Sequence, residues 1–229
     1  MLFVSRIAPP LLVALLMAGH AHGQHGHGPH DRHGNPEDLS AYVARIEDPA
    51  RDEWQRPDDV VRALGLKKGQ TVCDIGAGPG YFALRIARTV GDRGHVFAVD
   101  VDPEILGALR ERIERAGARN VTPVLALPAD PLVPAASCNL ILIVNTYHHF
   151  PDGVTYLRTL RRALAPRGRI ANIDFHKREL PGGLGPPLLA KVSREDFLRD
   201  AKAAGLKLVA EPTFLPHQYF LLLSPRSAR

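Results

Sequence analysis

The sequence of 229 residues predicts an α/β fold with a doubly wound, mostly parallel seven-stranded sheet, helices on both faces and a C-terminal antiparallel hairpin. The first observation is that five apolar, strand-like runs alternate with segments of helical spacing, which is typical of a parallel sheet. The second is the short link at residues 215–217 between the last two strand-like runs. A link of that length permits only antiparallel pairing.

Turn and capping residues bound the predicted elements. The first strand is almost entirely apolar, as is typical of a strand buried on both faces. Asp102, Pro103 and Glu104 predict a helix start with Asp102 as the cap, and Gly117 ends that helix. The predicted strands are 71–75, 95–99, 120–125, 139–144, 169–175, 207–214 and 218–223. The predicted helices are 37–49, 58–64, 81–90, 103–116, 153–164 and 193–204.

The first 36 residues do not have the pattern of a folded domain. Residues 1–21 combine an early arginine, a short apolar stretch and a small-residue cleavage site, which predicts a signal peptide too short to span a membrane. Residues 22–36 are rich in histidine and glycine and predict a disordered linker, in which weak capture of a divalent metal is the alternative to a merely solvating role. We expect export to the periplasm, or a cytoplasmic location if the signal does not function. Residues 37–229 then form one domain.

Charge and cysteine content narrow the class of protein. The formal net charge is +5, but the basic residues are scattered and no stripe with interleaved aromatics occurs. This pattern favours a solvated surface over a nucleic-acid interface. Cys73 and Cys138 lie in apolar runs without metal-ligand spacing, so we expect small buried thiols rather than a disulfide, and no metal site in the domain.

A glycine-rich turn follows the first predicted strand, at Gly76-Ala77-Gly78-Pro79-Gly80. Glycines let the backbone turn tightly and approach a ligand closely, and the helix that follows favours an anionic group. Asp74, at the end of the strand, repels a pyrophosphate but attracts an ammonium group. Asp100, after the second strand, suits a ribose diol. The alternative is a purely structural turn.

These residues resemble motifs of the S-adenosylmethionine (SAM)-dependent methyltransferases of the Rossmann-like class, in particular those of type 11. The runs that carry the resemblance are residues 72–82, 96–106, 139–152 and 164–170, within a similar region from Trp54 to Pro225. The resemblance implies that SAM is the cofactor and that the domain at 37–229 is a methyltransferase. It also implies a set of SAM-binding residues: Asp74, Gly76, Ala77, Gly78, Gly80, Tyr81, Asp100, Val101, Asp130 and Asn145. Asp130 is a loose match for the adenine contact, because the family's usual acid stands earlier and the fourth strand begins with Asn139 rather than Asp.

Candidate catalytic residues follow the fourth predicted strand: Asn145, Tyr147 and His148. Methyl transfer needs a positioned nucleophile, and a base only where that nucleophile arrives protonated. His148 is the candidate base, whereas His149 is better explained by packing. Asp174 and His176, after the fifth strand, are either site residues or surface loop residues. Tyr81 and Trp54 line the pocket or pack in the core, and the segment Lys177 to Pro187 is expected to cover the acceptor.

Three functions remain open from the sequence. The favoured one is methyl transfer from SAM to an unidentified acceptor, more plausibly a small molecule than a protein. The second is a non-catalytic periplasmic protein that binds SAM or a nucleoside and carries a metal-binding histidine-rich tail. The third is an NAD-dependent oxidoreductase, against which Asp74 and the G-x-G-x-G spacing argue.

Overall fold

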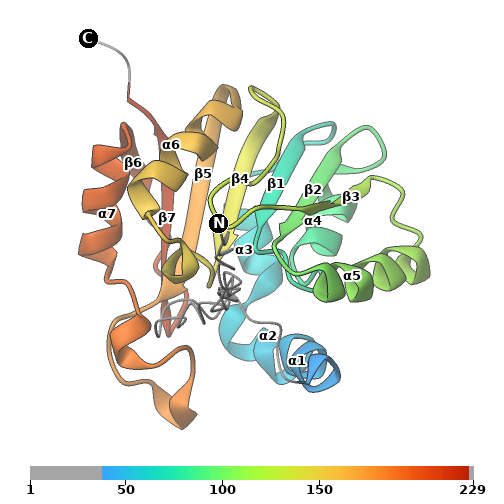
Figure 1. The fold of residues 1–229 in the computed structure, drawn as a ribbon, viewed down its shortest axis with the longest axis horizontal. Coiled ribbons are helices and arrows are strands. Elements are labelled where there is room, and N and C mark those ends of the chain that lie inside the picture. The colour runs from blue at the N-terminus through green and yellow to red at the C-terminus, as the bar shows by residue number, and fades with distance from the viewer. Residues whose placement is uncertain (1–37, 227–229) are drawn as a thin grey trace, which may run out of the picture.

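A computed structural model describes residues 38–226, and a single twisted sheet runs through the centre of this part of the chain (Figure 1). Its strand order is β3-β2-β1-β4-β5-β7-β6, and β7 pairs antiparallel with both β5 and β6. The predicted fold class is therefore confirmed. The strands are β1 (Thr71–Ile75), β2 (His95–Asp100), β3 (Val121–Leu125), β4 (Cys138–Val144), β5 (Leu164–Phe175), β6 (Leu206–Ala210) and β7 (Gln218–Pro225).

Helices pack on both faces of the sheet and form two hydrophobic cores. One core holds Val60, Ile86 and Leu106 against one face, and the other holds Leu157 and Phe197 against the opposite face. The helices are α1 (Leu39–Ile46), α2 (Ala50–Gln55), α3 (Pro57–Ala63), α4 (Ala83–Val90), α5 (Pro103–Ala116), α6 (Gly153–Ala163) and α7 (Arg194–Ala203). Single 3-10 turns are η1 (Tyr147–His149), η2 (Pro181–Gly183) and η3 (Leu188–Ala190).

Three differences between the structure and the predicted elements are the largest. Helix α2 was not predicted, because its six residues between Pro49 and Pro57 are too few to show a helical period. Strand β5 begins at Leu164, five residues before the predicted start, since the Pro-Arg-Gly run that resembles a turn is included in the strand. Strand β6 ends at Ala210, well before the predicted end at residue 214. Asp102 caps α5 as predicted, accepting from the backbone N–H groups of Glu104 and Ile105.

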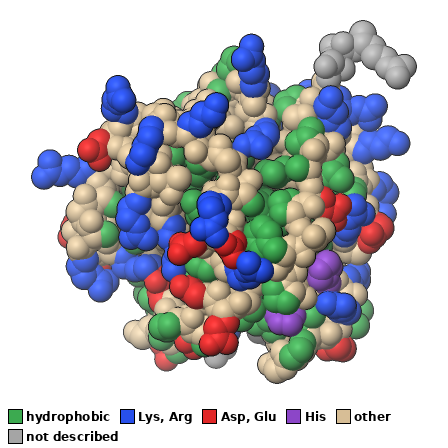
Figure 2. All heavy atoms as spheres, turned by 180° about the vertical axis from the view of Figure 1, so that it is seen from behind, with side chains coloured by type: hydrophobic (Ala, Val, Ile, Leu, Met, Phe, Trp, Pro, Cys, Tyr) green, Lys and Arg blue, Asp and Glu red, His purple; other side chains and the backbone are tan. Residues whose placement is uncertain are grey.

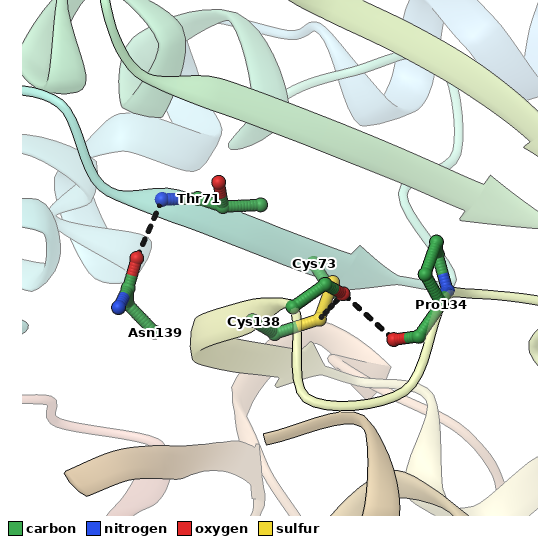
Figure 3. Close-up of a disulfide and its surroundings, with 6 residues drawn as sticks. Thr71, Cys73, Pro134, Cys138 and Asn139 are labelled. Atoms are coloured by element: carbon green, nitrogen blue, oxygen red, sulfur yellow. Dashed lines mark hydrogen bonds between the residues drawn. A yellow bond between two sulfur atoms is a disulfide. The ribbon is translucent and has the colours of Figure 1, made fainter. Parts of the chain in front are cut away.

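The prediction of two free thiols is wrong: a disulfide joins Cys73 and Cys138. Figure 3 shows it between β1 and the start of β4, beside the loop that contains Pro134. The two Cα atoms lie 5.9 Å apart, within the range that a disulfide spans. Both residues are fully buried, as predicted, but their 65-residue separation gave no sign that the fold would bring them together.

The predicted signal peptide, the predicted histidine-rich linker and the predicted start of the domain at residue 37 lie outside the described residues. Within residues 38–226, no helix is long and apolar enough to cross a bilayer, and no group of three or more potential ligands could hold a metal ion. Figure 2 shows lysine and arginine side chains spread over the back of the molecule, with acidic side chains among those lower in the view.

Candidate active site

A cavity of about 860 Å³ opens at the carboxyl ends of the parallel strands. Its walls come from the ends of β1, β2 and β4, from helices α1 and α2, and from the glycine-rich segment 182–187. In Figure 1, α1 and α2 lie below the ends of these strands, on the side of the sheet edge where the cavity opens. Ligands bind at this edge in doubly wound folds, so the cavity is the candidate active site.

The turn after β1 is held by backbone hydrogen bonds to β2. The N–H groups of Gly76 and Ala77 donate to the carbonyl of Val99 at 2.8 and 2.9 Å. Gly76 has φ +70°, and a Cβ there would lie 2.3 Å from the side-chain oxygen of Thr146. Only glycine therefore fits at this position, and the backbone of the turn is exposed directly to the cavity, which Gly76, Ala77 and Gly78 line.

Asp74 is buried at the end of β1, with 3% of its surface exposed, yet it lines the cavity. The backbone N–H of Ala83 donates to its carboxylate, but its Oδ2 atom has no hydrogen-bond partner. Burial, and then the negative charge of Asp100, raise its pKa to about 7. A buried carboxylate oxygen without a donor is unfavourable, and a cationic group in the cavity would satisfy it.

Asp100 lies at the end of β2, next to the glycine turn. Its carboxylate accepts from the N–H of Gly78 at 2.9 Å and from the N–H of Asp102 at 3.2 Å. Burial raises its pKa, while these backbone donors oppose that rise. Each carboxylate oxygen has a second lone pair, so Asp100 can still accept from a ligand hydroxyl. Val101 also lines this end of the cavity.

Helix α2 contributes a cation to the cavity that the sequence analysis missed. The guanidinium of Arg51 lies 3.8 Å from the centre of the Tyr81 ring and is sufficiently buried that its pKa is lowered. Its Nε atom is buried without a partner. The Tyr81 hydroxyl donates to Asp52 in the same helix, which joins α2 to the helix after the glycine turn. Arg51 had no sequence signal, because α2 itself was not predicted.

Asn145 follows β4 and lines the cavity with a left-handed backbone, φ +54°. Its Oδ1 accepts from Gln218 at 2.6 Å, and Gln218 in turn accepts from Gln55 at 2.8 Å. Both glutamines are buried. This chain of amides connects α2, the start of β7 and the end of β4. It leaves the amide N–H groups of Asn145 as donors for a ligand.

His148 lines the cavity and is paired with a buried carboxylate. Its Nδ1 lies 3.2 Å from Oδ2 of Asp174, and their side chains are 6% and 1% exposed. The N–H of Phe175 holds the other oxygen of Asp174 at 2.8 Å. Asp174 is thus a site residue in contact with His148, whereas His176 lies outside the cavity lining. His149 also lines the cavity and packs against His148, with ring centres 4.2 Å apart and ring planes tilted by 43°.

Three of the residues predicted to act in catalysis or SAM binding also lie outside the cavity lining. Tyr147 is buried against α7, and its hydroxyl donates to Asp200 at 2.9 Å. Asp130 is exposed in the loop after β3, where Ala126 and Pro128 line the cavity instead. Gly80, with φ +94°, packs against the side chain of Leu109. Tyr147 and Gly80 thus have packing roles in the structure.

Aromatic side chains and the glycine-rich 182–187 segment form another part of the cavity wall. The rings of Trp54 and Phe175 lie with centres 5.6 Å apart, and both residues line the cavity. A Cβ on Gly185 would lie 2.8 Å from the Phe175 ring, so the backbone of the 182–187 segment packs directly on it. The buried Lys191 donates to the carbonyls of Arg178 and Leu184, which fixes this segment over the cavity.

Residues 66–211, more than half of the chain, match the family described as the methyltransferase domain. The chain belongs to this methyltransferase family. The fold is similar to that of a SAM-dependent methyltransferase from Aquifex aeolicus, with a TM-score of 0.76 and 26% identity over 82% of this chain and 98% of that one. The methyltransferase match excludes the interpretation as an NAD-dependent oxidoreductase.

Two curated relatives agree with this assignment. A demethylmenaquinone methyltransferase of Listeria welshimeri is 26% identical over 130 residues, which cover 57% of this chain and 54% of that protein. The methyltransferase YdaC of Bacillus subtilis is 25% identical over 169 residues, which cover 74% of this chain and 86% of that protein. The chain thus spans about half the length of the first of these relatives.

The cofactor of this class of methyltransferases is SAM, and the cavity fits it. The unpartnered Oδ2 of Asp74 matches the ammonium group at the methionine end of SAM. The glycine turn presents the backbone of Gly76 and Gly78 to the cavity, where a ligand can approach it closely. Asp100 lies beside the same turn, where its carboxylate can accept hydrogen bonds from the two hydroxyl groups of the ribose.

Proposed function

We propose that this methyltransferase transfers the methyl group of SAM to a small-molecule acceptor inside the cavity. The observation that carries the proposal is the buried Asp74 carboxylate with an oxygen that has no donor. SAM supplies an electrophilic methyl group, so the protein has to hold the donor and place a nucleophile in line with it.

Arg51 completes the recognition of the donor's amino acid end. Arg51 and Asp74 both line the cavity, and the positive charge of Arg51 opposes the rise in the pKa of Asp74. An α-amino acid carries an ammonium and a carboxylate on one carbon, so an acid and an arginine in the same wall match both groups. Asp74 then binds the ammonium and Arg51 the carboxylate, while Asp100 accepts from the ribose hydroxyls.

An acceptor of small size is supported by the shape of the far end of the cavity. The 182–187 segment, fixed by Lys191, covers this end, and Trp54 and Phe175 form an apolar wall there. A covered, largely apolar wall suits a small organic molecule better than a protein side chain on a folded partner. The quinone-like acceptor named for the Listeria relative is one compound to include among those tested.

Calorimetry with SAM, S-adenosylhomocysteine and NAD tests the donor site. We expect binding of the first two and none of NAD. Asp74→Asn and Asp100→Asn are each expected to weaken SAM binding, whereas Asp58→Asn, on the outside of α3, is the matched control and is expected to bind as the wild type does. The absence of SAM binding by the wild type would refute the proposal. SAM binding without methylation of any acceptor tested would support the non-catalytic alternative.

Export is the second part of the proposal. The leader-like residues 1–21 and the Cys73–Cys138 disulfide both support an oxidising compartment, where disulfides persist. Mass spectrometry of the mature protein from the producing cell tests it. We expect an N-terminus near residue 22 and cysteines that resist alkylation until they are reduced. A full-length N-terminus with two alkylated cysteines would refute export.

A further inference from the structure

The geometry points to a weakly acidic aromatic hydroxyl group as the methyl acceptor, with His148 as the base that removes its proton and Asp174 as the residue that positions His148. This inference rests on the proposed function, because it concerns the acceptor half of the same cavity. It identifies the class of acceptor, which neither the family match nor the donor site does.

Asp174 determines the tautomer of His148. Asp174 can only accept when ionised, so Nδ1 of His148 carries the hydrogen that points to it at 3.2 Å. The lone pair of the ring then lies on Nε2, the nitrogen left for a ligand in the cavity that His148 lines. The N–H of Phe175 fixes the Asp174 carboxylate, so the carboxylate itself is held in place.

Only some methyl acceptors need a base of this kind. A carboxylate or an ionised thiol reaches the methyl group with its lone pair already free, and a base adds little to its reaction. A neutral hydroxyl group is a poor nucleophile until its proton is removed. A histidine held by a buried carboxylate suits such an acceptor, because its free ring nitrogen can take the hydroxyl proton.

An aromatic wall lines the same cavity as His148. Phe175 directly follows Asp174 on β5, so the strand that orients the base also supplies an aromatic surface. The ring centre of Trp54 lies 5.6 Å from that of Phe175. The backbone at Gly185 packs on the Phe175 ring without a side chain between them. A flat ring with one hydroxyl group fits this surface, because aromatic groups pack well on one another.

The step balances as follows. The O–H bond of the acceptor breaks, and its proton goes to Nε2 of His148. The oxygen lone pair forms the new bond to the methyl carbon. The electron pair of the breaking carbon–sulfur bond stays on sulfur, which leaves as the neutral thioether S-adenosylhomocysteine, while the charge gained by His148 faces Asp174.

The experiment uses 4-substituted phenols that range from unsubstituted phenol to 4-nitrophenol, with an alkylamine and an alkylthiol for comparison. Wild-type protein is expected to methylate the phenols. His148→Gln should lower kcat for the least acidic phenols by about 10²- to 10⁴-fold, the usual contribution of a general base. It should retain most activity with 4-nitrophenol, which is largely ionised in mildly alkaline buffer and needs no base.

Asp174→Asn tests the positioning role. An asparagine amide can donate to Nδ1, which favours the tautomer with its hydrogen on Nε2 and so removes the base. We expect kcat to fall with the same dependence on phenol acidity, while KM for SAM stays unchanged. His176→Gln, directly after the end of β5 and outside the cavity lining, is the matched control and should behave as the wild type does.

The donor site is measured separately in each variant by calorimetry with SAM. Wild-type protein that binds no SAM contradicts the proposed function. Wild-type protein that binds SAM but methylates only the amine or the thiol, or none of the panel, overturns the inference about the acceptor. A His148→Gln variant that binds SAM and is slowed equally with every phenol overturns the assignment of the base.

Discussion

Asp74 and Asp100 lie at the ends of the neighbouring strands β1 and β2, and the charge of Asp100 helps burial to raise the pKa of Asp74 to about 7. The protonated form of Asp74 is therefore well populated in the ligand-free protein at neutral pH. The ammonium of SAM binds the ionised form, so binding has to release that proton.

SAM affinity is thus expected to rise with pH between pH 5 and 7. Below the raised pKa, each pH unit increases the ionised fraction of Asp74, and the association constant should rise by up to about tenfold per unit. Calorimetry at several pH values measures this. Asp74→Asn should bind more weakly with little dependence on pH, and a wild-type affinity that is constant from pH 5 to 7 would contradict this coupling.

Arg51 provides the second prediction. Arg51→Gln removes the charge that we propose binds the donor carboxylate, and SAM affinity should fall about 10- to 100-fold, the usual range for a hydrogen bond to a charged group. The matched comparison is 5′-methylthioadenosine, which lacks the amino acid end. Its affinity should be the same in the variant and in the wild type, and an equal loss for both ligands would indicate a general distortion of α2.

That most of the residues proposed to bind the donor meet at one cavity was largely predictable from the sequence, because they lie at or directly after the ends of strands. Asp74, the glycines and Asp100 follow strands whose order places their ends together, so a strand pattern and a turn motif suffice. The pairing of His148 with Asp174 depends on residues 26 positions apart, and Arg51 on a helix without a detectable period. Such contacts are set by packing across the sheet, which a one-dimensional pattern does not contain.

The same limit explains why the side-chain partners of Tyr147 and of Cys73 were not predicted from the sequence. Tyr147 directly precedes His148, but the η1 turn directs the two side chains to different places, one to α7 and one to the cavity. Cys73 and Cys138 were recognised as buried, yet their bond depends on how β4 enters the sheet beside β1. Burial follows from local hydropathy, whereas a specific partner does not.

Tyr147→Phe separates a structural role from a catalytic one. Burial and the hydrogen bond to Asp200 raise the pKa of Tyr147 above its ordinary value, so its phenol stays protonated and cannot act as a base. We expect a loss of about 1 kcal/mol in the free energy of unfolding, seen as a fall of about 2–4 °C in Tm, with unchanged kcat. A large fall in kcat with unchanged Tm would restore Tyr147 as a catalytic residue.

The disulfide provides the last prediction. Because it closes a loop of 65 residues, its loss should lower the free energy of unfolding by about 2–5 kcal/mol, by relaxing the constraint on the unfolded chain. Urea denaturation of Cys73→Ala/Cys138→Ala, compared with oxidised wild type, measures this loss. SAM affinity in the absence of urea should change little, because neither cysteine lines the cavity. An undiminished midpoint would mean that the bond does not stabilise the fold, and a lost SAM site in a folded variant would mean that it acts through its neighbour Asp74.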